Sequence, residues 1–305
     1  MRPDRAVRTA AAALIEWERA FEKALLSGDP LTASDILRRT GRRGWVKKAE
    51  YSRAAAIVRA QSASSFVRRD WATRLLQHPR RVDKELAAVI LRPLIATNRP
   101  DVERAVHRLA RDDDWEVRET AASLLGDCLE RAFDAYLRTA QGWIATGEPR
   151  LRRAVVVGAK YAARSRHPER AEPLLDLIEP ALKEPDEYVR RNLGPFAIGD
   201  QLLRSYPDAT FARLERWARD PDENVRWNVA STFTSASGAK VAERGFGVLA
   251  FLAADTRPFV TRAVSAAVRN ILKRRPELRD AIAEWDGGTR AAVRRALEAA
   301  GEARA

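Results

Sequence analysis

Apolar side chains recur at helical spacing along the chain. One clear run comprises Val117, Ala121, Leu124, Leu125, Cys128 and Leu129. This spacing places all of them on a single face of one helix. Alternation with a period of two is scarce, so the pattern predicts an all-α protein with almost no strand.

A short phrase close to Pro/Asp-x-x-Val-Arg recurs at the predicted helix starts. Its apolar position is filled by Val82, Val117, Leu151, Val189, Val225, Val260 and Val293. The successive intervals are 35, 34, 38, 36, 35 and 33 residues. A period in the mid-thirties is the signature of a helical repeat array.

The stronger copies of the phrase carry an aspartate that can cap the helix, four residues before an arginine. The pairs are Asp114/Arg118, Asp186/Arg190 and Asp222/Arg226. Such an aspartate–arginine ladder is typical of HEAT repeats. We therefore expect HEAT-like helix pairs that stack into a curved α-solenoid with a basic concave face.

No segment divides the chain into parts of different composition, so we expect one HEAT-like repeat domain over 1–305. Within it, 1–50 would hold N-terminal helices and a basic loop, 51–235 the core repeats and 248–305 the C-terminal capping repeats. The three glycines of 235–247 indicate a longer loop. Pro195 is expected to kink its helix unless a helix begins there.

The charge of the chain points to a polyanionic partner. Lys and Arg total 55 against 42 Asp and Glu, a formal net charge of +13, and 47 of the 55 cations are arginines. Guanidinium groups bind phosphate in a bidentate way. Nucleic acid is the simplest partner, and an acidic protein surface or an anionic membrane surface are the alternatives.

Several classes of protein are excluded by what the sequence lacks. No apolar run approaches the length of a membrane span, and the first ten residues contain no apolar core of a signal peptide. With Cys128 as the one cysteine and three histidines, neither a disulfide framework nor a Cys/His zinc site is expected. Phosphate-loop and nucleophile-elbow motifs are absent. We expect no metal or cofactor, a monomer, and a cytoplasmic, nucleoid-associated location.

Four segments carry a resemblance more specific than that of a generic HEAT repeat. They are 114–121 with its Trp-x-x-x-acid helix start, 151–155 with Arg-Arg-Ala, 189–194 followed by Tyr-Pro-Asp at 206–208, and 215–217 together with 222–229. Together they resemble the HEAT-like DNA alkylation-repair glycosylases, the AlkD and AlkC superfamily.

The resemblance implies excision of cationic N3- or N7-alkylated purines from duplex DNA without deep base flipping. It gives Trp115 the aromatic role and Glu119 the carboxylate that stabilises an oxocarbenium-like sugar. Arg153 matches a phosphate-facing arginine of the family. The chain departs from the family where Glu119 replaces an aspartate and Arg150 a tryptophan, and Phe196 would have to serve for a second tryptophan.

Cations and aromatic residues beyond these motifs are candidates for DNA contact. The full set is Lys47, Lys48, Arg118, Arg152, Arg153, Arg190, Arg191, Phe196 and Trp227. The double arginines stand at equivalent points of successive repeats, which line up along one face of a solenoid. Trp71 and Trp217 are expected in the core, whereas Trp227 could lie in the core or on the concave face.

Two other hypotheses remain open at this stage: a non-catalytic DNA-binding HEAT protein and a HEAT scaffold for other proteins. Trp115 could instead pack against the start of its helix, and Glu119 could be a solvated surface acid. The excess of positive charge disfavours the scaffold, which needs no such charge.

Overall fold

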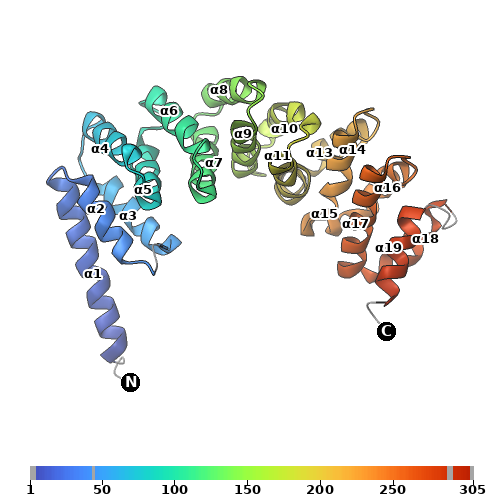
Figure 1. Ribbon diagram of the computed structural model, residues 1–305, viewed down its shortest axis with the longest axis horizontal. Coiled ribbons are helices and arrows are strands. Elements are labelled where there is room, and N and C mark those ends of the chain that lie inside the picture. Colours follow the sequence, from blue (N-terminus) through green and yellow to red (C-terminus); the bar gives the residue numbers. More distant parts are fainter. Residues whose placement is uncertain (1–4, 43–44, 287–290, 303–305) are drawn as a thin grey trace. The chain divides into compact units, whose positions relative to one another are not determined.

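The computed structural model describes residues 5–42, 45–286 and 291–302. In these ranges the chain folds into helices joined by short turns (Figure 1), and no β-strand occurs beyond an isolated bridge between Arg42 and Trp45. The predicted all-α class is confirmed. Across the same residues, no helix combines the length and the apolar character that a membrane crossing requires.

The chain forms two compact units, Met1–Ala132 and Phe133–Ala305. The single-domain organisation and the curved solenoid with a basic concave face stay predictions.

The first unit consists of helix pairs packed against one another. Its elements are α1 (Arg5–Leu26), α2 (Pro30–Arg39), α3 (Lys48–Ala60), α4 (Ser65–Gln77), α5 (Arg81–Leu91), the 3-10 turn η1 (Arg92–Leu94), α6 (Arg99–Ala110) and α7 (Trp115–Arg131). α4 packs along α5, α6 along α7, and α5 also contacts α7. The apolar face predicted for α7 is fully buried, the thiol of Cys128 included.

The second unit contains both long helices and short helical turns. Its elements are α8 (Phe133–Ala145), α9 (Pro149–Ala162), η2 (Pro168–Arg170), α10 (Ala171–Ile178), η3 (Glu179–Lys183), α11 (Glu187–Asn192), η4 (Leu193–Leu202), α12 (Leu203–Ser205), α13 (Pro207–Trp217), α14 (Glu223–Thr232), α15 (Ala236–Lys240), η5 (Ala242–Gly245), α16 (Phe246–Ala253), α17 (Pro258–Arg274), η6 (Pro276–Leu278), α18 (Arg279–Ala283), η7 (Glu284–Asp286) and α19 (Ala291–Glu302). α14 packs against both η4 and α17.

The predicted aspartate caps are confirmed. The side chains of Asp114, Asp186 and Asp222 accept hydrogen bonds from backbone N–H groups two residues on, at 2.9, 2.8 and 2.7 Å. Each bond satisfies a donor that the first helical turn would otherwise leave unpaired.

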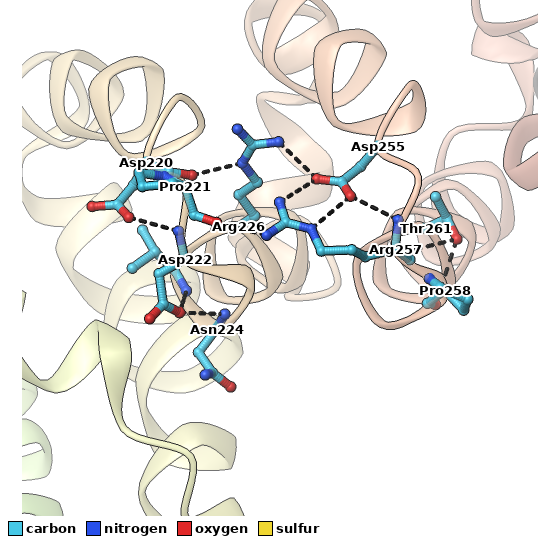
Figure 2. A network of polar contacts seen from close by, with 10 residues as sticks. Asp220, Pro221, Asp222, Asn224, Arg226, Asp255, Arg257, Pro258 and Thr261 are labelled. Carbon is cyan, nitrogen blue, oxygen red and sulfur yellow. Dashed lines mark hydrogen bonds and ion pairs between the residues drawn. The ribbon is translucent and has the colours of Figure 1, made fainter.

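The arginines of the predicted ladder bind the turn before their own helix, and two of them reach the next repeat. Arg190 donates to the carbonyl of Pro185 and to Asn224 Oδ1. Arg226 donates to the carbonyl of Asp220 at 2.7 Å and to Asp255 Oδ2 at 2.8 Å (Figure 2). The ladder therefore joins one repeat to the following one.

The segment around Pro195 continues as a helix of unusual winding. Residues Leu193–Leu202 form the π-helix η4 directly after α11, so the helix winds wider at the proline. Asn228 Oδ1, buried in α14, accepts a hydrogen bond from Gly194 N at 3.0 Å.

Two loop predictions differ from the structure. The expected long loop at 235–247 is wrong, because α15 and η5 occupy it and Ser235 Oγ caps α15 by accepting from Gly238 N at 2.8 Å. The irregular basic stretch at 41–52 is shorter than expected, since α3 begins at Lys48. Arg43 and Gly44 of that stretch lie outside the described residues.

Candidate nucleic-acid groove

A groove of about 740 Å³ runs along one side of α7 in the first unit. We call it the α7 groove. Its ionisable and aromatic lining residues are Lys48, Tyr51, Arg59, Glu85, Arg92, Trp115, Glu116, Glu119, Asp127 and Arg131. They come from α3, α5, η1 and α7, so the groove is built by packing helices that are distant in sequence.

One wall of the α7 groove is a polar stripe of α7. Trp115, Glu119, Ser123 and Asp127 follow one another at intervals of four residues, which places them on one side of the helix. The opposite side of α7 carries the buried apolar face that begins at Val117. Trp115, the first residue of α7, lies on the polar side and is 60% exposed.

Cations line the rim and one end of the groove. Lys48 and Arg59, both on α3, are exposed. Arg92 donates to Asp127 Oδ2 at 2.5 Å and to Ser123 Oγ at 3.3 Å, and Arg131 donates to the carbonyl of Arg92. The carboxylate of Asp127 is thus neutralised locally, and Lys48 and Arg59 are left on the surface.

A second polar pair lies on the α3–α5 side of the groove. Tyr51 Oη donates a hydrogen bond to Glu85 Oε2. Burial raises the pKa of the Glu85 carboxyl, and burial together with the Glu85 charge raises the pKa of Tyr51 well above its usual range. Arg81, beside Glu85, forms an ion pair with Glu116 and lies 4.5 Å from the centre of the Trp45 ring.

The α7 groove brings together three of the predicted site residues, Trp115, Glu119 and Lys48. Lys47 is exposed directly before α3. Arg118 donates to the carbonyls of Asp112 and Asp113, at the start of α7. The remaining predicted residues belong to the second unit, where they form separate clusters.

The double arginines of the second unit differ in exposure. Arg152 pairs with Glu184, and Arg153 is 7% exposed and lies over the Tyr188 ring. The side chain of Arg191 is 72% exposed and pairs with Glu187 at 2.6 Å. Among the arginines of the two Arg-Arg pairs, at 152–153 and 190–191, Arg191 is the most exposed.

The two predicted aromatic residues of the second unit, Trp227 and Phe196, each lie beside a cation. Trp227 stacks on Phe259 with ring centres 5.8 Å apart, and the Arg190 guanidinium lies 5.1 and 4.9 Å from the two ring centres. Lys160 Nζ lies 3.1 Å from the centre of the Phe196 ring and 3.1 Å from Asp200 Oδ2. Trp227 is half-buried, while Trp71 and Trp217 lie in the core as predicted.

Several lining residues were missed from the sequence: Tyr51, Arg59, Glu85, Arg92, Asp127 and Arg131. The signal that could have revealed some of them is separation by one repeat. Tyr51 and Glu85 are 34 residues apart and Arg92 and Asp127 are 35 apart, so each pair joins equivalent points of neighbouring repeats. Among the described residues, no group of three or more His, Cys, Asp or Glu side chains could hold a metal ion.

Comparison with known proteins gives one family match. Residues 46–197 match the model of a family described as DNA alkylation repair enzyme. No curated protein matches the chain. Among solved structures, a crystal structure of an engineered protein is 18% identical, covers 68% of this chain and 98% of its own, and has a TM-score of 0.30.

Proposed function

Because the segment 46–197 belongs to the DNA alkylation repair enzyme family, we propose that the protein is a DNA glycosylase that releases cationic N3- or N7-alkylated purines from duplex DNA. Family membership supports the coarser statement, a function in DNA repair. The observation that carries the finer proposal is that Trp115 and Glu119 lie one helical turn apart on the same wall of the α7 groove.

The proposed chemistry does not require the protein to protonate the leaving base. An alkylated purine already carries a positive charge, so no strong general acid is required to expel it. Breaking the glycosidic bond leaves positive charge on the sugar. The half-buried carboxylate of Glu119 would stabilise that charge and hold the attacking water.

Trp115 would act on the base or sugar through its ring face. The indole is 60% exposed at the first residue of α7, so a ligand can approach it from outside the protein. A cation over an indole face is attracted by its quadrupole. This access at the surface supports excision without drawing the base into a deep pocket.

The exposed cations would hold the DNA backbone. At or next to the α7 groove of the first unit these are Lys47, Lys48 and Arg59, and in the second unit Arg191 is the most open of the predicted arginines. Contacts of this kind position a duplex without reading its sequence. We propose double-stranded DNA as the partner, a monomeric protein and a nucleoid-associated place in the cytoplasm.

The test is release of free base from duplex DNA that carries 7-methylguanine or 3-methyladenine. Wild type is expected to release base, and Glu119→Gln is expected to lose release while its DNA affinity stays unchanged. Glu215→Gln, an exposed carboxylate on α13, is the matched control and should keep wild-type release. Release by Glu119→Gln at the wild-type rate would contradict the carboxylate role.

A wild-type protein that binds duplex DNA in a salt-sensitive manner but releases no base would contradict the glycosylase proposal. It would favour the non-catalytic DNA-binding protein that the charge of the chain also allows.

A further inference from the structure

The α7 groove contains a second carboxylate that the proposed chemistry leaves unused. Glu85 on α5 and Tyr51 on α3 line the groove together with Trp115 and Glu119 of α7. The side chain of Glu85 is 17% exposed, so its charge is held largely away from bulk water. A carboxylate in such a position is stabilised only by close donors or cations.

The donors around Glu85 balance its charge incompletely. Tyr51 donates a hydrogen bond but brings no positive charge. Glu85 Oε1 lies 3.8 Å from Arg81 Nε, at the outer limit of an ion pair, while the same guanidinium binds Glu116 directly. The Arg81 guanidinium is thus shared between two carboxylates, and the direct donor to Glu85 is the neutral Tyr51 hydroxyl.

Asp127, another carboxylate that lines the groove, differs from Glu85 in the donor that balances its charge. Its carboxylate takes a direct hydrogen bond from Arg92 at 2.5 Å, and that arginine also donates to Ser123. Asp127 is therefore neutralised within the groove wall. Glu85, in contrast, takes its direct hydrogen bond from a neutral hydroxyl.

Aromatic rings accompany the carboxylates at the same groove. The exposed Trp115 indole stands on α7 and the Tyr51 ring on α3. Carboxylates combined with ring faces make a site that favours a flat cation over a neutral molecule of the same shape. Both features meet in a cavity of about 740 Å³, large enough for a purine nucleoside.

We propose that Glu85, held by Tyr51, forms a cation subsite of the α7 groove that selects the positively charged purine against its neutral parent. The identity of the occupant rests on the proposed function. The subsite gives Glu85 a specificity role that is separate from the role of Glu119, because it acts on the charge of the base and not on the sugar.

The direct test is binding of free nucleosides to the full chain, measured by titration calorimetry. The probes are 7-methylguanosine, at a pH at which its ring is positively charged, and guanosine, its neutral parent without the methyl group. Wild type is expected to prefer the cation by about tenfold, since a largely buried carboxylate a few ångströms from a charge contributes on the order of that factor. Glu85→Gln should lower this preference clearly, and the preference that remains is the share of Trp115 and Glu119.

Tyr51→Phe provides a second variant that keeps the ring and removes the hydrogen bond. It should reduce the preference partly, because the carboxylate stays but is no longer held in place. Glu215→Gln is the control and should keep the wild-type preference. Thermal unfolding of each variant shows whether it is folded, and Tyr51→Phe carries the test if Glu85→Gln does not fold.

The outcomes separate this proposal from the glycosylase proposal. Equal affinity of wild type for the two nucleosides, or an unchanged preference in folded Glu85→Gln, would overturn the cation subsite even if the wild-type protein releases base. Selective nucleoside binding without base release would keep the subsite and overturn the glycosylase.

Discussion

Arg226 on α14 and Asp255, in the turn before α17, form a 2.8 Å ion pair that joins two successive helical repeats (Figure 2). The carboxylate also accepts hydrogen bonds from the Arg257 side chain and backbone N–H. These donors, Arg257 before Arg226, hold the pKa of Asp255 far below its usual range. The Asp255 side chain is 2% exposed and that of Arg226 is 20% exposed, so a buried carboxylate and a partly buried guanidinium join the two repeats.

This junction predicts a loss of stability in acid. A carboxyl whose pKa is lowered by folding stabilises the native state above its unfolded pKa of about 4, and this contribution fades as the pH falls below that value. Asp255→Asn should lower the free energy of unfolding by about 3 kcal/mol at neutral pH, as for other broken buried pairs. Urea unfolding across a pH series should show a weaker pH dependence below pH 4 for the variant. An unchanged pH dependence would contradict the assignment.

Trp115 is expected to matter for base release and not for folding. Trp115→Ala should slow release of 7-methylguanine by about tenfold, and Trp115→Phe by less, because phenylalanine keeps a weaker ring face. Since the indole is 60% exposed, both variants should unfold within about 0.5 kcal/mol of wild type. A large drop in the unfolding midpoint would instead indicate that Trp115 packs the start of its helix.

Lys48→Ala and Arg191→Ala are each expected to weaken DNA binding by a similar factor for every sequence tested. Each removes one exposed cation, so the slope of log affinity against log salt should fall by about one per variant. Fluorescence anisotropy over a salt series measures this slope. Sequence-dependent losses, or an unchanged slope, would remove the residue from the proposed DNA surface.

For Arg153, both DNA affinity and the free energy of unfolding should be measured. The residue is 7% exposed and hydrogen-bonded to Asn192, so its side chain can contribute to packing as well as to DNA binding. Arg153→Ala is expected to reduce DNA affinity if the side chain turns toward a phosphate when DNA binds. If the residue only packs the repeat, the variant should lower the unfolding free energy by about 1–3 kcal/mol and leave the salt slope unchanged.

Gly194→Ala should destabilise the second unit. A Cβ at this position would lie 2.6 Å from the backbone oxygen of Asn228, so η4 and α14 would have to separate. We expect a loss of about 1–3 kcal/mol, typical of overpacking, measured by chemical unfolding. Gly142→Ala, on α8 with no atom close to the added methyl group, is the control and should be neutral or slightly stabilising.

Much of the fold could be predicted from the phrase that recurs at the helix starts. The aspartate caps, the apolar face of α7 and the buried positions of Trp71 and Trp217 follow from local spacing alone, and the structure has all of them. The π-helix at Pro195 does not follow from local spacing. Its winding accompanies the close approach of Gly194 to Asn228, which is a tertiary contact.

The candidate site was only partly predictable. Trp115 and Glu119 share one helix, so their spacing shows that they share a face. Tyr51 and Glu85 meet only because α3 packs against α5, and neither residue belongs to the repeated phrase. Such contacts join residues that are about one repeat length apart in the sequence, as Tyr51 and Glu85 are at 34 residues. Comparing positions one repeat apart would reveal them.

The full burial of Cys128 gives the protein a practical property. Its thiol is shielded from labelling reagents, so the native chain offers a silent background for thiol chemistry. A cysteine introduced at the exposed Lys47 would then carry a single spin label or fluorophore beside the α7 groove. Such a probe would report the arrival of a DNA duplex directly, without any need for turnover.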